Sequence, residues 1–492
     1  MRNQGLGSWP ARRARMTPDR VALSHGGGRA TYRELHARVN RLASALRDLG
    51  VRRGDRVAYL GVNHPALVET FFAAGTLGAI FVPLNTRLAA PELDRILRDA
   101  GPAVLLAGAE HAELAASLPA RPADHGELTA AGDPAPIDEP VDRDEVCLIM
   151  YTSGTTGTPK GAMLTHANLT WNTFNLLVDV PLAHDEVTLI SAPLFHIAAL
   201  AQTLVPTVLK GGTAVLEPAF DVERTFDLIE AERVTVMFGV PAMFAFLSRS
   251  PRWPEADLSS LRYLLCGGAP VPEPLIRAYQ DRGLTFLQGY GMTETSPGAL
   301  FLAAEHSVAK AGTAGVPCFF SDVRLVGPDG APAAPGEPGE VHVRGPNVTP
   351  GYWRRPEETA KVLSQDGWFR SGDIGVADED GYVRISDRIN DMIISGGENV
   401  YPAEVESALY GHPDVAECAV IGVPDDRWGE VGKALVVLRP DAKGGGADLL
   451  AYLDGRLARF KIPKYVEFVP QLPRNAAGKV LKAQLRTSHG AP

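Results

Sequence analysis

Short, nearly continuous runs of hydrophobic residues alternate along most of the chain with segments that have helical periodicity. The runs occupy residues 56–61, 103–108, 145–151, 186–191, 234–240 and 261–266. Helical patterns lie between them, for example at residues 66–77 and 273–282. Strands without a polar face are typical of parallel sheets that are covered by helices on both sides. The pattern therefore predicts an α/β fold whose sheets are mostly parallel.

The later part of the chain has a different character. Residues 327–344 combine turn-forming residues with a short strand pattern, which indicates a section dominated by β-structure. From about residue 391, strand patterns at 416–423 and 433–438 alternate with helical patterns and predict a compact α+β module. The last of these helical patterns covers residues 448–459. With 492 residues, the chain is long enough for a large core and this smaller module.

Charge and cysteine content exclude several classes of protein. The net charge is −10 and no basic stretch dominates, which argues against a nucleic-acid partner. The four cysteines are widely spaced and form no CxxC pair, so we expect neither a zinc site nor a disulfide framework. The N-terminal residues include several arginines but no apolar segment like that of a secretory signal. Together these features predict a cytoplasmic protein.

The segment YTSGTTGTPKG at residues 151–161 directly follows a predicted strand. Its glycines let the backbone curl so that N–H groups point inward, its hydroxyl groups add donors, and Lys160 supplies positive charge. This combination predicts a cradle for a polyphosphate; a flexible Ser/Gly/Thr linker is the alternative. It differs from a Walker A loop because Pro159 precedes the lysine and Gly161 follows it. The predicted phosphate-binding residues are Thr152, Ser153, Gly154, Thr155, Thr156, Gly157 and Lys160.

Further short motifs follow this segment along the chain. They are PLFH at 193–196, GGAP at 267–270, QGYGMTE at 288–294, SGDI at 371–374, DR at 387–388, GGEN at 396–399 and PRNAAGK at 473–479. With these motifs, nearly the whole chain resembles the adenylate-forming superfamily, which comprises acyl-CoA synthetases, nonribosomal adenylation domains and luciferases. The signature ISGGENVYP at residues 394–402 is most similar to that of bacterial fatty-acyl-CoA ligases.

The resemblance implies a domain organisation. Residues 1–388 would form an AMP-binding N-terminal domain with two doubly wound, mostly parallel sheets and a distorted β-barrel. Residues 389–492 would form a small, mobile α+β domain that rotates about a hinge between two steps of a reaction. The hinge falls on Asn390, where many relatives have Asp or Lys, and Asn tolerates unusual backbone angles.

The resemblance also implies a two-step reaction that uses ATP, Mg²⁺ and CoA. A carboxylic acid first reacts with ATP to give an acyl-adenylate and pyrophosphate, and CoA then displaces AMP. Joining two anions requires positive charge at the transition state, which the family assigns to Lys479 together with Mg²⁺. Glu294 would hold the metal with Thr155, while Thr293 would bind a phosphate oxygen. His196 would close the pocket for the carboxylate; a buried structural histidine is the alternative.

Other motif residues take nucleotide-binding or CoA-binding roles by the same resemblance. Tyr290 would stack on adenine, and Asp373 would accept hydrogen bonds from the ribose beside Arg388. Residues 395–397 would form a narrow passage for the pantetheine arm of CoA, and Trp428 would either reorganise between the steps or be purely structural. The full set is Gly268, Ala269, Gln288, Gly289, Tyr290, Gly291, Asp373, Arg388, Ser395, Gly396, Gly397 and Trp428.

The class of acid is inferred from the residues that are expected to line the substrate pocket. Residues 195–200, 238–242 and 291–297 should line it, and their small or apolar side chains favour a medium- or long-chain fatty acid. Gly289 occupies the position at which malonyl-activating relatives carry an arginine, which argues against a dicarboxylate. An aryl acid is the alternative substrate. An acyl-AMP ligase that loads a carrier protein and a non-catalytic nucleotide- or acyl-binding regulator are alternative functions.

The predicted partners are small molecules, namely a carboxylic acid, ATP and CoA. A lipid substrate would favour weak contact with a membrane surface through a group of N-terminal arginines. These are Arg2, Arg12, Arg13 and Arg15. A homodimer is compatible with the sequence but is not indicated by any motif.

Overall fold

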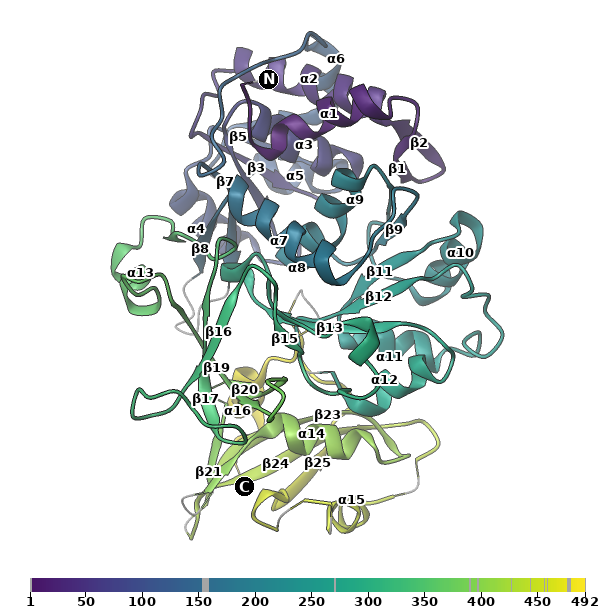
Figure 1. Cartoon of the computed structure of the whole chain (residues 1–492), viewed down its shortest axis with the longest axis vertical. Helices are drawn as coiled ribbons and strands as arrows, with labels where there is room; N and C mark the ends of the chain where they lie inside the picture. The colour runs from purple at the N-terminus through teal and green to yellow at the C-terminus, as the bar shows by residue number, and fades with distance from the viewer. Residues whose placement is uncertain are drawn as a thin grey trace.

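The computed structural model describes the chain except for residues 1, 153–158, 270, 389–390, 396–397, 426, 443, 455, 458, 476–478 and 492. The N-terminus lies at one end of an elongated molecule, and the C-terminal domain lies at the other end (Figure 1). Large sheets covered by helices form the N-terminal domain, which confirms the predicted α/β class.

One sheet of the N-terminal domain has the strand order β18-β8-β7-β4-β3-β5-β6. Its strands are β3 (Arg56–Leu60), β4 (Ile80–Leu84), β5 (Val104–Ala107), β6 (Pro122–Asp124), β7 (Val146–Thr152), β8 (Lys160–Thr165) and β18 (Gly351–Tyr352). Strands β3 to β7 pair in parallel, and β8 and β18 extend the sheet as antiparallel neighbours. Thr152 at the end of β7 and Lys160 at the start of β8 therefore lie opposite each other in the sheet.

A second sheet has the order β15-β14-β13-β12-β11-β9-β10-β1-β2. Its strands are β1 (Val21–His25), β2 (Gly28–Thr31), β9 (Val187–Ile190), β10 (Thr213–Leu216), β11 (Val236–Gly239), β12 (Tyr263–Cys266), β13 (Phe286–Gly291), β14 (Gly298–Phe301) and β15 (Val316–Pro317). Its central strands are parallel, and β2, β14 and β15 are antiparallel edges. Ligands usually bind at the carboxyl ends of such parallel strands.

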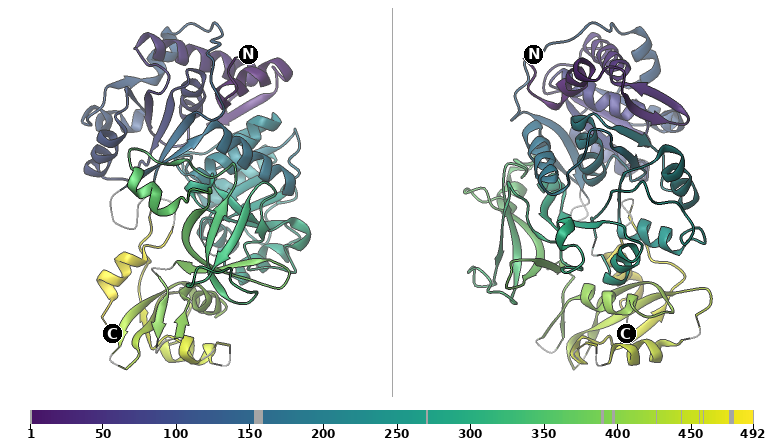
Figure 2. Two further views of the ribbon diagram at one scale, coloured as in Figure 1. Left: turned by 60° about the vertical axis from the view of Figure 1, so that its left-hand side comes forward. Right: turned by 45° about the vertical axis from the view of Figure 1, so that its right-hand side comes forward.

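Helices cover both faces of these sheets (Figures 1 and 2). They are α1 (Trp9–Met16), α2 (Tyr32–Asp48), α3 (Pro65–Thr76), α4 (Ala90–Ala100), α5 (Ala112–Ala116), α6 (His125–Ala131), α7 (His166–Asp179), α8 (Ile197–Ala199), α9 (Val205–Lys210), α10 (Val222–Glu232), α11 (Pro241–Arg249), α12 (Glu273–Gln280) and α13 (Pro356–Val362). Helix α2 starts at a capping box in which Thr31 Oγ1 accepts from the Glu34 N–H at 3.2 Å. Its buried face contains Leu35 and Leu42, as helical periodicity dictates.

An antiparallel sheet follows in the order β16-β17-β19-β20. Its strands are β16 (Asp322–Val326), β17 (Pro338–Arg344), β19 (Phe369–Ala377) and β20 (Val383–Arg388). Irregular register between β17 and β19 and between β19 and β20 distorts the sheet. Its apolar face packs against Ala299 and Leu300 of β14, so the sheet is joined to the second large sheet at the predicted place of the distorted barrel.

The C-terminal domain is a small α+β unit, as predicted. Its sheet has the order β22-β21-β24-β23, and β25 also pairs with β24. Its elements are β21 (Ile393–Ser395), β22 (Glu398–Val400), α14 (Pro402–Tyr410), β23 (Val415–Asp425), β24 (Gly429–Leu438), α15 (Gly446–Leu453), β25 (Tyr465–Phe468) and α16 (Lys482–His489). Figure 2 shows this domain, in green to yellow, packed against the end of the N-terminal domain.

Some details of the C-terminal part differ from the sequence-based expectation or lie outside the described residues. Helix α15 ends at Leu453 rather than near residue 459, because Asp454 adopts an extended backbone conformation. Residues 389–390 lie outside the described part of the chain. The predicted domain boundary between residues 388 and 389 and the predicted hinge at Asn390 therefore stay predictions. Among the described helices, none combines the length and apolarity that crossing a membrane requires.

Candidate active site

A cavity of about 2160 Å³ lies where the carboxyl ends of β11, β12 and β13 face the C-terminal domain. Most of the predicted site residues that the structure describes line it. They are Thr152, Lys160, His196, Gly268, Ala269, Gln288, Gly289, Tyr290, Gly291, Thr293, Glu294, Asp373 and Lys479. Segments from residue 152 to residue 479 thus meet around a single space, which is large enough for a nucleotide and a second substrate.

Several predicted residues cannot be placed in the cavity. Ser153, Gly154, Thr155, Thr156, Gly157, Gly396 and Gly397 lie outside the described residues, as does the side chain of Arg388. Ser395 is buried and its backbone pairs with Gly429, away from the cavity lining. Trp428 is 45% exposed and stacks under Arg427. The roles proposed for these residues stay predictions.

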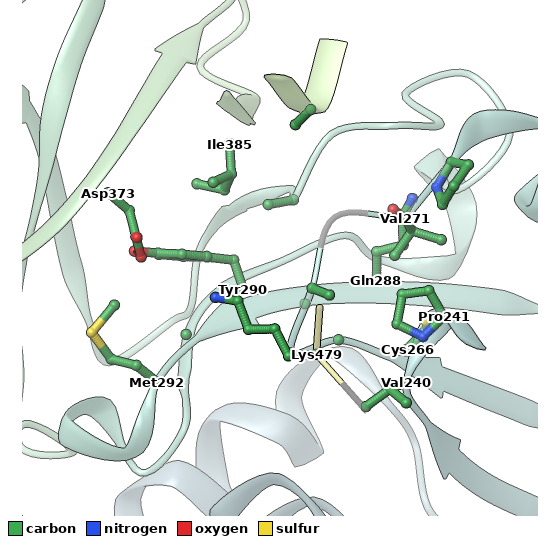
Figure 3. A pocket seen from close by; sticks show the side chains of 18 of the residues that line it. Val240, Pro241, Cys266, Val271, Gln288, Tyr290, Met292, Asp373, Ile385 and Lys479 are labelled. Carbon is green, nitrogen blue, oxygen red and sulfur yellow. The ribbon is translucent and has the colours of Figure 1, made fainter. Parts of the chain in front are cut away.

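Tyr290 and Asp373 meet at one side of the cavity, although they come from β13 and β19 (Figure 3). The Tyr290 hydroxyl donates a hydrogen bond of 2.8 Å to Asp373 Oδ2. Asp373 follows Ser371 and Gly372 within β19, and its backbone N–H donates to Ser371 Oγ at 3.0 Å. The backbone register also places Asp373 opposite Arg388 on β20. In this arrangement the aromatic ring can bind the adenine of a nucleotide, and the carboxylate can bind its ribose.

Glu294 lies in a 3₁₀ turn, Thr293–Thr295, that follows β13 and Met292. Its carboxylate is buried and accepts a hydrogen bond of 2.8 Å from the Tyr352 hydroxyl on β18. Burial, with a further contribution from Glu294, raises the pKa of Tyr352 well above its ordinary value. The Tyr352 hydroxyl therefore stays protonated, and its hydrogen bond orients the Glu294 carboxylate.

Lys160 begins β8, directly after the predicted phosphate cradle. Its Nζ atom donates to Glu358 Oε2 at 2.5 Å and lies 5.4 Å from the centre of the Tyr352 ring. The hydrogen bond from Lys160, with a second from Lys361, lowers the pKa of Glu358 to about 2. Both Tyr352 and Glu358 were absent from the predicted site. Neither lies in a recognisable motif, so only the fold reveals them.

Lys479 reaches this region from the C-terminal domain. It lines the cavity, and Figure 3 labels it among the side chains drawn there. Its backbone N–H donates to Asn475 Oδ1 at 2.9 Å, and the Asn475 N–H donates to the Lys479 carbonyl at 2.8 Å. These reciprocal bonds fix the backbone that carries the lysine.

His196 occupies the N-cap position of α8, and the centre of its ring lies 4.8 Å from that of Phe195. Its place in the cavity lining agrees with the predicted pocket for the carboxylate. Gln288, near the end of β13, is buried in the same lining, and its Nε2 atom has no hydrogen-bond partner within the described part of the chain. A bound ligand could supply that acceptor.

A model of the family described as "AMP-binding enzyme" matches residues 10–353, and the "AMP-binding enzyme C-terminal domain" matches residues 404–479. The chain belongs to the AMP-binding enzyme family. Both matched ranges lie inside the predicted domains, and the resemblance to adenylate-forming acyl-CoA synthetases is confirmed.

Curated relatives of this AMP-binding enzyme are acid–CoA ligases over their full length. Feruloyl-CoA synthases from Amycolatopsis sp and Streptomyces sp are 60% identical, with 100% of each chain covered. Indoleacetate–CoA ligase from Aromatoleum aromaticum is 43% identical over 98% of this chain and 97% of its own. Long-chain-fatty-acid–CoA ligase FadD13 from Mycobacterium tuberculosis is 41% identical over 94% of both chains.

Solved structures of a related enzyme share the fold. The o-succinylbenzoate CoA synthetase of Bacillus subtilis with its acyl-adenylate intermediate is 36% identical, has a TM-score of 0.89 and matches over 99% of both chains. The same enzyme with ATP and magnesium is 37% identical, has a TM-score of 0.88 and covers 97% of this chain and 99% of its own. The present AMP-binding enzyme is accordingly an ATP-dependent acid–CoA ligase that forms an acyl-adenylate and uses Mg²⁺ and CoA.

The carboxylate of Glu294 suits Mg²⁺ in such an enzyme. Within the described residues, no group of three or more His, Cys, Asp or Glu side chains could hold a metal ion on its own. Mg²⁺ commonly takes one or two carboxylates and fills its remaining positions with phosphate oxygens and water. A single carboxylate that is oriented by Tyr352 fits that preference, whereas Thr155, the second predicted ligand, lies outside the described residues.

Proposed function

We propose that the enzyme activates an aryl acid of the hydroxycinnamate type, an aromatic ring on a short unsaturated chain, and transfers it to CoA. The observation that carries this proposal is the 60% identity to feruloyl-CoA synthases over the whole chain, against 41% to a long-chain-fatty-acid–CoA ligase. The fatty acid that was expected from the sequence is not confirmed, and its alternative, an aryl acid, agrees better with these relatives.

The side chains at the acyl end of the cavity are compatible with a flat aromatic ring. Leu176, Phe238 and Leu300 are buried, and with Ala198 they provide apolar walls. Buried side chains in a well-packed core cannot shift far, so they favour a ligand of defined shape over a flexible chain. This supports the choice of a rigid aryl acid.

In the first step, a carboxylate oxygen of the acid attacks the α-phosphorus of ATP while the bond to pyrophosphate breaks. Lys160 would neutralise phosphate charge, and Lys479 would stabilise the charge that develops at the α-phosphate. Glu294, held by Tyr352, would bind Mg²⁺, which supplies further neutralisation when it is bound. His196 would close the carboxylate site.

In the second step, the sulfur of CoA attacks the acyl carbon and AMP leaves. Lys479 lines the cavity in this structure and Ser395 does not, which supports assigning the observed arrangement to the adenylation step. Rotation of the C-terminal domain would then withdraw Lys479 and bring residues 395–397 to the acyl-adenylate. A carrier protein remains the alternative acceptor.

The proposal is tested by incubating the purified enzyme with ATP, Mg²⁺, CoA and one acid at a time. The acids are ferulate, 4-hydroxycinnamate, cinnamate, hexanoate and hexadecanoate, and AMP and thioester are measured separately. We expect kcat/KM to be at least about tenfold higher for the aryl acids, equivalent to about 1.4 kcal/mol. Preference for hexadecanoate would reject the aryl proposal, and adenylate without thioester would reject CoA as the acceptor.

A further inference from the structure

Residues 473–489, the Lys479 segment, comprise the loop that carries Lys479 and the helix α16 that follows it. Helix α16 has eight residues, all of them described, and only Leu485 is buried. A helix of this length is marginally stable without tertiary contacts, and a single buried side chain leaves its orientation loosely defined. The position of the segment, and with it that of Lys479, therefore depends on further contacts.

Three ion pairs within the described residues take an arginine or a lysine from the Lys479 segment. Each of these basic residues finds its carboxylate in another part of the C-terminal domain. The pairs are Arg474–Glu417 at 2.6 Å, Lys482–Glu406 at 2.9 Å and Arg486–Asp391 at 2.7 Å. The carboxylates lie on β23, on α14 and just before β21. The segment is thus tied to the domain on both sides of Lys479 along the chain.

The pair of Lys482 and Glu406 joins two helices that cover opposite faces of the sheet. Helix α14 contributes Val405 to the apolar cluster on one face, whereas α16 contributes Leu485 to the cluster on the other face. Since β23 is an edge strand, Glu406 Oε1 can accept the Val420 N–H, at 2.8 Å. The backbone thereby fixes the carboxylate, and Lys482 Nζ lies 2.9 Å from the same oxygen atom.

This pair is also the most shielded from water of the three. Its side chains are 15% and 16% exposed, against 26% and 18% in the Arg474 pair and 32% and 20% in the Arg486 pair. Exposed ion pairs contribute little because water and salt screen them, whereas shielded pairs are screened much less. We therefore expect the pair of Lys482 and Glu406 to constrain the segment most.

Backbone hydrogen bonds close the loop that carries Lys479. Arg474 and Val480 form an antiparallel β-bridge, and the Leu481 N–H donates to the Pro473 carbonyl at 2.8 Å. Together with the reciprocal bonds of Lys479, these contacts fasten the two ends of the loop to each other. A displacement at the start of α16 is therefore passed on to Lys479, which lies three residues earlier.

We propose that Glu406 is a positioning residue for the adenylation step. By pairing with Lys482, it fixes the backbone that presents Lys479 to the α-phosphate of ATP. The inference rests on the proposed function, because it requires Lys479 to stabilise charge at that phosphate. Such stabilisation depends steeply on placement, and a displacement of about 1 Å can cost about a hundredfold in rate. The proposed transfer to CoA does not use Lys479 and should not need the pair.

The test compares Glu406→Gln with the wild type, using an acid that the wild type activates. Glutamine can still accept the Val420 N–H, but it lacks the charge that holds Lys482. We expect kcat for acid-dependent ATP–pyrophosphate exchange to fall about tenfold while the KM for ATP stays within about twofold, because Lys479 acts in the transition state. Thioester formation from supplied acyl-adenylate should stay within about twofold, which also shows that the variant is folded. Equal losses in both steps would overturn the inference.

Glu404→Gln is the matched control. Glu404 lies on the same helix and accepts a hydrogen bond of 2.8 Å from Lys461, which is not part of the Lys479 segment. The change in charge is the same, and both steps should stay within about twofold of the wild type. Lys482→Arg retains the cation and should keep most of the exchange rate, whereas Lys482→Met should reproduce the loss. A selective loss in Glu404→Gln, or none in Lys482→Met, would overturn the inference.

A double variant shows whether Glu406 acts through Lys479. In Lys479→Ala, acyl-adenylate formation is measured with the enzyme in excess over ATP, and adding Glu406→Gln should cause no further loss, because an absent lysine cannot be misplaced. A further loss of about tenfold would show an independent effect and overturn the inference. If Lys479→Ala keeps the wild-type exchange rate, the proposed role of Lys479 fails and the inference fails with it. If Lys479→Ala loses exchange and Glu406→Gln does not, the inference fails alone.

Discussion

At the residue scale, several side chains of the site are positioned by hydrogen bonds from neighbouring side chains. Tyr352 lines the cavity, its hydroxyl donates to Glu294, and the centre of its ring lies 5.4 Å from the Lys160 Nζ atom. Glu358 completes the arrangement by pairing with Lys160. Glu294, the proposed metal ligand, and Lys160, the proposed phosphate-binding lysine, therefore both contact Tyr352, and we propose that Tyr352 is a positioning residue.

Replacing Tyr352 with phenylalanine tests that role. The variant removes only the donor to Glu294, and a hydrogen bond to a charged group is worth about 1.5–3 kcal/mol. We expect the Mg²⁺ concentration for half-maximal AMP release to rise about tenfold, while kcat at saturating Mg²⁺ falls less. Tyr59→Phe is the control, because the Tyr59 hydroxyl is also buried but lies outside the cavity lining. An unchanged Mg²⁺ requirement in Tyr352→Phe would contradict the role.

At the scale of elements, the N-terminal segment is tied to the first residue of α7. The Leu6 N–H donates to Nδ1 of His166 at 3.1 Å, and the ring packs directly against Gly5. Burial lowers the pKa of His166 to about 4, below the value of about 6.5 for an exposed histidine. Between about pH 4 and pH 6.5, His166 is therefore neutral in the folded protein and takes up a proton when the protein unfolds.

This difference predicts a pH-dependent loss of stability. Below about pH 6.5 the unfolded chain binds a proton at His166 that the folded chain excludes until about pH 4, so the unfolding free energy falls through this window. At pH 5 the loss is about 2 kcal/mol by linkage. His166→Asn keeps an acceptor near Nδ1 but does not titrate, so its urea midpoint should fall less than that of the wild type between pH 7.5 and pH 5. Parallel decreases in both proteins would contradict the assignment.

At the scale of the whole molecule, the cavity is complete only when the two domains meet. Lys479 belongs to the C-terminal domain, while Lys160 and Glu294, the proposed phosphate-binding and metal-binding residues, belong to the N-terminal domain. Arg249 on α11 also donates to the carbonyl of Ala416 on β23, so side-chain contacts cross between the domains in this arrangement. A reaction that needs Lys479 in one step and a CoA passage in the other requires these contacts to be reversible.

Separate assays of the two steps test this account. Lys479→Ala should reduce acid-dependent ATP–pyrophosphate exchange by at least about a hundredfold, because the missing charge acts at the α-phosphate. Thioester formation from supplied acyl-adenylate should stay within about threefold of the wild type, since the proposed role of Lys479 ends once the adenylate exists. Lys464→Ala is the control, because Lys464 pairs with Asp425 outside the cavity lining. Equal loss in both steps would contradict alternation of the domains.

Much of the fold follows from the sequence because its signals act over short distances. The capping box of Thr31 and Glu34 and the spacing of Leu35 and Leu42 specify α2 locally. Hydrophobic runs specify the covered strands in the same way. The motifs predict a phosphate-binding segment, whose residues 153–158 lie outside the described part of the chain, and they point to Lys479, which lines the cavity. The end of α15 near Leu453 was not predicted, because element boundaries depend on packing as well as periodicity.

The tertiary structure alone decided which groups support the site. Tyr352 reaches Glu294 across 58 positions and Glu358 reaches Lys160 across 198, and no local pattern encodes such pairings. In the same way, only the packing of α14 and α16 on the C-terminal sheet brings Glu406 to its lysine partner. Periodicity reports which face of an element is buried, whereas contacts between distant elements depend on how the sheets and domains pack.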